Sequence, residues 1–173
     1  TLEHAVARGA TPLAVISGYG TSADAYHLTA GPKDGAGAAA AIQAALGMAS
    51  LSTDAIDHIN AHATSTPVGD RAEIASLRNV FGERLPAIPI SATKAATGHL
   101  LGAAGGIESI FSVLAANTQQ LPPTINLEHC DDDMQDLTFV TATRQDHNTQ
   151  HVLCNGFGFG GVNAALIISS IER

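Results

Sequence analysis

Two short segments of this sequence, each with a histidine, hold the residues best suited to chemistry. The first is Ile-Asn-Ala-His-Ala-Thr-Ser-Thr-Pro, at residues 59–67, and carries Asn60 and His62. The alternation over residues 56–62 is typical of a strand, in which Asn60 and His62 share a face. Ligands of open α/β sheets bind beyond the carboxyl ends of strands, so His62 is a candidate site residue. A core histidine followed by a Ser/Thr helix cap explains the same pattern.

The second segment is Ser-Ala-Thr-Lys-Ala-Ala-Thr-Gly-His, at residues 91–99, in which Lys94 follows a predicted strand. We expect a long helix over residues 97–116, with Thr97 as its N-cap. The positive end of the helix dipole and the Lys94 ammonium would both disfavour protonation of His99. A neutral His99 can act as a hydrogen-bond donor or as a base. The alternative is an exposed lysine and a first-turn histidine without a chemical role.

A lone carboxylate and a glycine-rich stretch add two further candidates. Glu108 lies among small and apolar residues; if it is buried, it must be paired or bind a cation, and otherwise it faces solvent. Residues 155–161, Asn-Gly-Phe-Gly-Phe-Gly-Gly, match the G-x-G-x-x-G pattern, but a strand rather than a helix is expected to follow. We therefore interpret them as a hairpin that brings backbone N–H groups close to a ligand.

Several other kinds of site are disfavoured. His58 and His62 have a spacing that binds metal on a helix, but the segment is predicted to be a strand. The sequence has neither a phosphate-binding loop nor a G-x-S-x-G nucleophile elbow. The two cysteines, Cys130 and Cys154, have no metal-ligand spacing, and three aspartates after Cys130 would raise the pKa of its thiol. Unpaired cysteines favour a reducing, cytoplasmic location.

Composition limits the class of protein. The 173 residues are 45% hydrophobic, enough for one well-buried core. The net charge is -8 and the only lysines are Lys33 and Lys94, so nucleic-acid binding is disfavoured. No apolar run approaches the roughly 20 residues that a membrane span requires, and no signal peptide is recognised. Abundant glycine and alanine predict closely packed helices and strands.

The elements that must position these residues alternate between strand and helix and then end in consecutive strands. This order predicts an α/β fold with a mainly parallel sheet and an antiparallel edge. Helices are expected over 1–12, 36–46, 70–81 and 97–116, and strands or short apolar segments over 13–18, 56–62, 87–91, 137–140, 151–154 and 162–168.

Three segments together resemble the C-terminal part of a β-ketoacyl-[acyl carrier protein] synthase, above all the type II elongating enzymes of bacterial fatty-acid synthesis. They are N-A-H-A-T-S-T-P-V-G-D (60–70), K-A-A-T-G-H-L-L-G-A-A-G-G (94–106) and G-F-G-F-G-G-V-N (156–163), and residues 26–37 also fit. The resemblance implies one domain, residues 1–173, that forms the C-terminal half of a thiolase-like α/β fold. That half has a mixed five-stranded sheet with helices on both faces.

The resemblance also implies roles for individual residues in decarboxylative condensation of malonyl-carrier with an acyl thioester. His62 and His99 would hold the thioester oxygen while enolate charge develops, and Lys94 would order the site. The backbone N–H of Phe159 would complete an oxyanion hole while its ring gates the acyl pocket. The remaining implied residues are the pantetheine-arm contacts Thr29, Thr64 and Thr66, and the ligands of a structural monovalent cation, Asn60, Glu108, Cys154 and Asn155.

The same resemblance implies partners and a missing part. An acyl carrier protein would deliver acyl and malonyl groups on its phosphopantetheine, and no other cofactor is expected. The nucleophilic cysteine and most of a homodimer interface would belong to an N-terminal half outside this sequence, so the chain by itself is expected to be inactive. Ala63 and Gly156 depart from the usual Gly and Ser. A polyketide ketosynthase and a non-catalytic partner of the chain-length-factor type are the alternatives.

Overall fold

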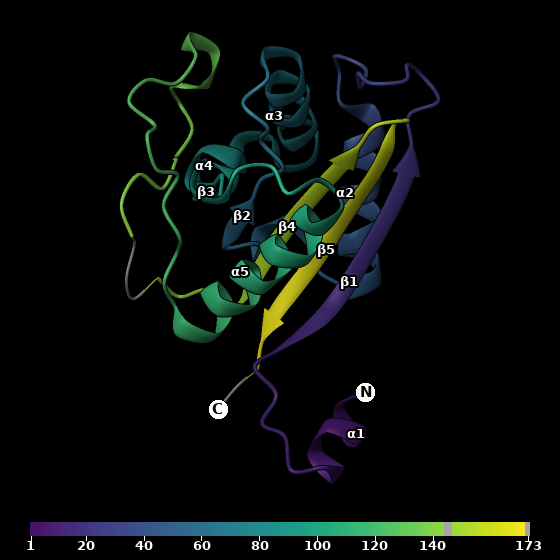
Figure 1. Ribbon diagram of the computed structural model, residues 1–173, viewed down its shortest axis with the longest axis vertical. Helices are drawn as coiled ribbons and strands as arrows, with labels where there is room; N and C mark the ends of the chain where they lie inside the picture. Colours follow the sequence, from purple (N-terminus) through teal and green to yellow (C-terminus); the bar gives the residue numbers. More distant parts are fainter. Residues whose placement is uncertain (144–146, 172–173) are drawn as a thin grey trace.

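Five strands form one mixed sheet in the order β1-β5-β4-β2-β3 (Figure 1). The computed structural model describes residues 1–143 and 147–171. β2 (His58–Asn60) is parallel to β3 (Ile90–Ser91) and β4 (His151–Gly158), whereas β5 (Val162–Ser170) is antiparallel to β4 and to β1 (Ala14–Ala23). The mixed five-stranded sheet is therefore confirmed. The antiparallel strand was expected at an edge of the sheet. It is β5, and it lies inside the sheet, because β1 pairs with the side of β5 that does not contact β4.

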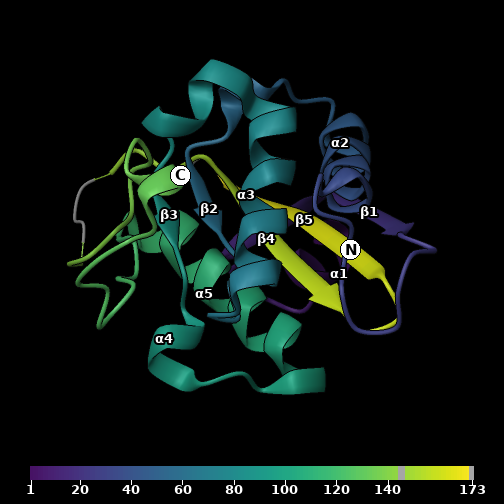
Figure 2. The ribbon, with the colours of Figure 1, turned by 90° about the horizontal axis from the view of Figure 1, so that it is seen from above.

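Helices cover both faces of this sheet, as expected. Seen from above, α2 (Ala36–Ala49) and α3 (Pro67–Phe81) lie on one face and α5 (Ala104–Thr118) on the other (Figure 2). The α2 helix packs closely because glycines of β1 face it: a Cβ at Gly20 would lie 2.0 Å from the carbonyl oxygen of Ala41. The larger core side chains fill the space between the sheet and α2 and α3, and include Ile42, Ile59, Leu77, Ile90, Leu153 and Ile167.

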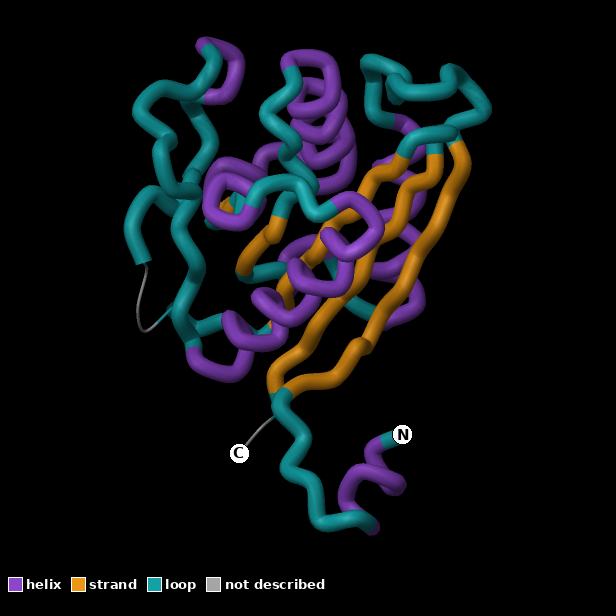
Figure 3. The backbone as a smooth tube through the Cα atoms, viewed as in Figure 1, coloured by secondary structure: helices purple, strands orange, loops and turns teal. Residues whose placement is uncertain are grey.

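The shorter elements lie at the ends of the sheet. α1 (Leu2–Ala7) lies apart from the sheet at the lower end of the molecule, and α4 (Lys94–Thr97) follows β3 (Figures 1 and 3). Four 3₁₀ turns complete the described elements, at Thr53–Ala55, Gly82–Ala87, Leu101–Ala103 and Asp132–Met134. No helix in the described ranges is long and apolar enough to cross a membrane.

Three predicted elements differ from the structure. The expected helix over 97–116 is wrong at its start, because the chain leaves α4 at Gly98 (φ 72°) and Leu101 also has a positive φ of 50°. Residues 137–140 contribute only one bridge, between Phe139 and Ile90. The strand predicted over 56–62 is paired only at His58–Asn60, so His62 lies in the loop that follows.

Candidate active site

The two histidines singled out by the sequence lie together. The ring centroids of His62 and His99 are 5.6 Å apart and the rings are nearly perpendicular, with an interplanar angle of 88°. They come from different loops: His62 follows β2, and His99 lies between α4 and the 3₁₀ turn Leu101–Ala103. The Phe157 ring of β4 contacts His62 from another side, at a centroid distance of 5.5 Å. His62 is half-buried, whereas His99 is exposed.

The Lys94 side chain bridges the His62 loop and α5 by hydrogen bonds to both. Its ammonium donates to the main-chain oxygen of His62 and to Glu108 Oε1, each at 2.5 Å, and lies 3.3 Å from His62 Nδ1. The lysine and glutamate side chains are only 5% and 2% exposed, so Glu108 is a buried and paired carboxylate rather than a solvent-facing one. Burial raises the pKa of Glu108, and the Lys94 ammonium opposes that rise.

The contacts of His62 set both its charge and its tautomer. Burial lowers the pKa of His62 to about 3, and the charges of Lys94 and His99 act in the same direction. The ring is therefore neutral near pH 7. Because the Lys94 ammonium can only donate, Nδ1 of His62 is the acceptor and its proton lies on Nε2.

His99 is fixed differently from the prediction. It does not open a helix, so the helix-dipole argument does not apply to it. Instead the backbone N–H of Leu101 donates to His99 Nδ1 at 3.4 Å. In the neutral ring this leaves the proton on Nε2, as in His62.

A buried carboxylate that the sequence reasoning missed supports the His62 loop. Glu73 of α3 accepts the backbone N–H groups of His62 (2.9 Å) and Ala63 (2.8 Å), and the side-chain amide of Asn155 (3.1 Å). Burial raises its pKa, and these donors oppose the rise. Ala63 has a φ of 27°, in the left-handed region. The sequence did contain a signal that Glu73 is buried. Glu73 lies four residues before Leu77 and therefore on the apolar stripe of α3.

The four predicted cation ligands are all buried, and Asn60 and Cys154 lie beside Glu108 and Ser112, whereas Asn155 contacts Glu73 of α3. The Asn60 amide donates to the main-chain oxygen of Glu108 (3.2 Å) and to Ser112 Oγ (3.4 Å) and accepts from Thr93 Oγ1 (3.2 Å). Glu108 Oε2 and Asn155 Oδ1 are buried oxygens without a hydrogen-bond partner among the described residues.

Other metal and thiol chemistry finds little support. Within residues 1–143 and 147–171, no cluster of three or more His, Cys, Asp or Glu side chains could hold a metal ion. The His58–His62 metal pair, which the sequence already disfavoured, has no support, because His58 is fully buried with Nε2 2.8 Å from Ser91 Oγ. Burial raises the pKa of Cys154 to about 11.

The predicted pantetheine and gating residues lie at the surface. Thr64 Oγ1 and Thr66 Oγ1 are 3.0 Å apart, at the start of α3. Thr29 and Phe159 are exposed in two loops that touch each other, since the Gly160 N–H donates to the Leu28 oxygen at 2.6 Å.

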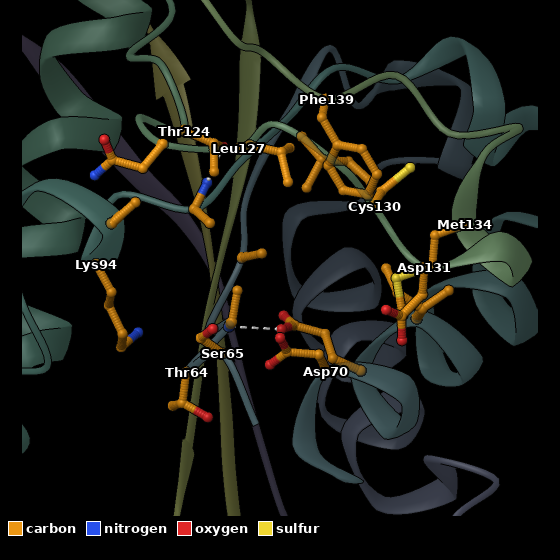
Figure 4. Close-up of a pocket in the computed structure, with 18 of the residues that line it drawn as sticks. Thr64, Ser65, Asp70, Lys94, Thr124, Leu127, Cys130, Asp131, Met134 and Phe139 are labelled. Carbon is orange, nitrogen blue, oxygen red and sulfur yellow. Dashed lines mark hydrogen bonds between the residues drawn. The ribbon is translucent and has the colours of Figure 1, made fainter. Parts of the chain in front are cut away.

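A pocket of about 640 Å³ lies beside the histidine loops, between α3 and the segment 124–134. Figure 4 shows Lys94, Thr64 and Asp70 at its lower part and Phe139 and Cys130 at its upper part. His99 also lines this pocket, whereas Thr29, Thr66 and Phe159 do not.

Comparison with known proteins shows which family this chain belongs to. The family model "Beta-ketoacyl synthase, C-terminal domain" matches residues 13–128. The chain belongs to this family. As a β-ketoacyl synthase domain it is 45% identical over 172 residues to 3-oxoacyl-[acyl-carrier-protein] synthase 2 of Staphylococcus aureus and 44% identical to that of Vibrio harveyi. Each alignment covers 99% of this chain but 41% of the relative, so the chain spans about two fifths of the length of these curated relatives.

Solved structures give the same fold for this β-ketoacyl synthase domain. A type II polyketide ketosynthase in complex with its acyl-carrier protein superposes with a TM-score of 0.94 at 34% identity, covering 99% of this chain and 42% of that one. A β-ketoacyl synthase from Burkholderia phymatum gives a TM-score of 0.86 at 35% identity, covering 98% and 40%. The expected thiolase-like half-fold is confirmed.

Proposed function

We propose that this domain is the C-terminal part of a 3-oxoacyl-[acyl carrier protein] synthase. The parent enzyme elongates acyl chains by decarboxylative condensation with malonyl-[acyl carrier protein] in fatty-acid synthesis. The observation that carries the proposal is that the His62 and His99 rings lie together, with centroids 5.6 Å apart, and that an N–H donor faces Nδ1 of each ring. In both His62 and His99 the Nδ1 atom accepts a hydrogen bond, which leaves Nε2–H as a donor. Two such donors suit a thioester oxygen that becomes an enolate when carbon dioxide leaves.

In this mechanism the other residues position or electrostatically support the pair. Burial and the Lys94 ammonium together keep His62 neutral, and Lys94 also donates to the main-chain oxygen of His62. Glu73 accepts the backbone N–H of His62 and so fixes the position of its ring. Thr64 and Thr66 offer hydroxyls to the pantetheine arm, with Thr29 beside it, and the Phe159 N–H supplies an oxyanion contact to the acyl thioester. These last roles rest on the family resemblance.

A structural monovalent cation fits the residues near Glu108. Hard cations take oxygen ligands, and the unpartnered Glu108 Oε2 is a buried oxygen that could supply one. The assignment of Asn155 to the same ion rests on the family resemblance. Asn60 and Cys154 lie in the same buried region. We assign this ion a structural role in fixing the loops around the histidines.

The isolated chain is proposed to be inactive, because neither of its cysteines suits the nucleophilic step. Burial raises the pKa of Cys154 to about 11, so its thiol does not ionise near pH 7. Cys130 is half-buried in the segment 124–134, and the family resemblance does not place the nucleophile there. The acyl-accepting cysteine is assigned to an N-terminal half, together with a homodimer interface, and the location to the cytoplasm.

The test uses the full-length parent protein. His62→Ala and His99→Ala should each reduce malonyl-[acyl carrier protein] decarboxylation about 100-fold or more, as expected when an oxyanion donor is removed. His129→Ala, a substitution of an exposed histidine on the pocket segment, is the control and should keep the rate. Undiminished decarboxylation in both site variants would refute the roles. Ketoacyl product from the isolated chain would refute its proposed inactivity.

A polyketide ketosynthase is the second candidate, because one structural neighbour, with a TM-score of 0.94, is the ketosynthase of a type II polyketide system. The two pathways differ in product. Repeated condensation without reduction of the keto groups, assayed with purified parent enzyme and malonyl-[acyl carrier protein], would favour the polyketide function. A single condensation per acyl primer supports the fatty-acid function.

A further inference from the structure

We propose that residues 125–133 form a strap that covers the pocket beside His99, and that this strap opens when salt screens its ion pairs to α3. In Figure 1 the strap belongs to the green loop that runs beside α3. Its opening changes access to the pocket and does not depend on which reaction the histidines carry out.

Both ends of the strap are anchored in the folded domain. At one end the Thr124 N–H donates to the Val140 oxygen (2.6 Å), and Thr124 Oγ1 accepts the Ala92 N–H (2.9 Å). At the other end Met134 and Leu137 are buried in the core, each 8% exposed. Movement of the residues between these anchors therefore leaves the core unchanged.

Between its anchors the strap has few contacts that fix it. Every residue over 125–133 is exposed except Leu127 and Cys130, which are half-buried. Among the described residues, the main chain of the strap makes one hydrogen bond to another element, from Arg78 Nη2 to the Asp133 oxygen at 2.9 Å. A segment with few buried contacts and an exposed backbone opens at a much lower free energy than the whole domain unfolds.

The Arg71 guanidinium of α3 forms the ion pairs that hold the strap. Its Nη2 atom lies 3.1 Å from Asp131 Oδ2, and its Nε atom lies 3.8 Å from Asp133 Oδ2. All three side chains are more than half exposed, from 52% to 62%. Exposed ion pairs stabilise weakly and are screened by salt, since the Debye length falls from about 8 Å at 0.15 M to about 3 Å at 1 M ionic strength.

Like charges oppose the closed position of the strap. Asp131, Asp132 and Asp133 are consecutive in the sequence, and Asp131 lies near Asp70 of α3. Burial raises the pKa of Asp70 and the charge of Asp131 adds to the rise, against hydrogen bonds from the backbone of residues 64–66. In the closed strap the Arg71 cation offsets this repulsion. Screening or removing that cation therefore favours movement of the strap away from α3.

The strap forms one wall of the pocket of about 640 Å³ that lies between it and α3. Figure 4 shows Leu127, Cys130 and Asp131 of the strap at this wall. His99 is also part of the lining. Displacing the strap therefore opens this side of the histidine pair to solvent and to small molecules.

Cys130 reports on the position of the strap. It is half-buried in the pocket lining, whereas Cys154, the other cysteine of the sequence, is 4% exposed in β4. Local opening exposes Cys130 alone, and global unfolding exposes both thiols. Alkylation by N-ethylmaleimide, which is uncharged, is measured at each cysteine by peptide mass spectrometry. Each rate is divided by that of the urea-unfolded chain at the same salt concentration, which removes the effect of salt on the thiol itself.

We expect the normalised Cys130 rate to rise at least about threefold between about 0.02 M and 1 M NaCl, while Cys154 stays protected. Arg71→Asp replaces attraction by repulsion, so it should raise the Cys130 rate about tenfold at low salt and remove the increase with salt. Adding Asp131→Arg restores an ion pair in the reverse direction and should return the rate to that of the unmodified chain. Arg8→Asp makes the same charge change at the end of α1, outside the pocket lining, and should leave the rate unchanged.

Three results would overturn the proposal. The first is a normalised Cys130 rate that does not change with salt, and the second is an Arg71→Asp rate equal to that of the unmodified chain. The third is parallel alkylation of Cys154, because the exposure would then come from global unfolding. If Arg71→Asp does not fold, Arg71→Gln gives the same comparison with a smaller expected increase.

Discussion

His62 and His99 face each other across 5.6 Å, but the molecule holds them in opposite ways. The His62 loop is fixed by the Glu73 carboxylate, the Lys94 ammonium and the Phe157 ring, all from different elements. The His99 loop is exposed, and its ring has one long hydrogen bond to its own neighbour, from the Leu101 N–H.

The difference shows which part of the pair this domain organises by itself. His62 is pre-positioned by buried polar groups that also maintain the fold, so its placement is coupled to stability. His99 has few contacts beyond its own loop, so its placement depends on short-range backbone geometry. Substitutions around the two rings should therefore have very different effects on the free energy of unfolding.

We expect Lys94→Met to cause the largest change in the free energy of unfolding. It leaves the Glu108 carboxylate buried without its cation, which should lower the free energy of unfolding by about 4 kcal/mol. Glu108 then takes up a proton more readily in the folded state, so the loss should be smaller at pH 5 than at pH 8. Urea unfolding at both pH values measures this. Adding Glu108→Met should recover most of the loss; if it does not, the pair is not what holds the two loops together.

Glu73→Ala should rank next. The backbone N–H groups of His62 and Ala63 and the Asn155 amide would lose their acceptor, at a cost of about 3 kcal/mol. Glu83→Ala, on the 3₁₀ turn after α3, is the exposed control and should change stability little. Similar unfolding curves for the two variants would show that the His62 loop does not depend on this carboxylate.

Acid should lower the free energy of unfolding through the buried His62 ring. Its folded pKa of about 3 lies below the unfolded value near 6.5, so the unfolded chain binds more protons between these values. Stability is therefore retained above pH 6.5 and is lost as the pH falls toward 3, by about 2 kcal/mol for this group between pH 7 and pH 5. His58 contributes in the same direction. His62→Gln should show a shallower loss in urea titrations, and an unchanged slope would contradict the buried-neutral assignment.

The smallest expected effect on stability is that of His99→Ala. The side chain is exposed and its single hydrogen bond is 3.4 Å long, so the free energy of unfolding should change by less than about 0.5 kcal/mol. Thermal unfolding monitored by circular dichroism is sufficient. A loss as large as that of Glu73→Ala would remove the contrast between the two loops.

Sequence patterns predicted the parts of the molecule that rest on periodicity and on local motifs. The helix over 70–81 was found because its apolar stripe faces the core, and the hairpin near residues 156–163 because glycines interrupt two apolar runs. The neighbouring positions of His62, His99 and Lys94 followed from the resemblance. Their position at the ends of β2 and β3 agrees with the general rule for α/β sheets.

Other features depend on tertiary contacts that no local pattern records. Nothing in the apolar run after Thr97 indicates that Gly98 and Leu101 take positive φ angles, so one long helix was predicted where a loop carries His99. Glu73 was overlooked because a single acidic residue on a helix normally faces solvent, although its place on the apolar stripe of α3 indicated burial. Its function depends on backbone N–H groups that fall beside it only after β2 and α3 have packed.

Ala63 shows how a single backbone angle restricts evolution. Its φ of 27° is easily adopted by glycine, the residue that the family resemblance implies here, and is tolerated by alanine at some cost. Valine, isoleucine and threonine are branched at Cβ and are poorly accommodated there. In a library of random variants, we therefore expect only glycine and alanine to be well tolerated at position 63. Bulkier residues should be lost, although the Ala63 side chain takes no part in the chemistry.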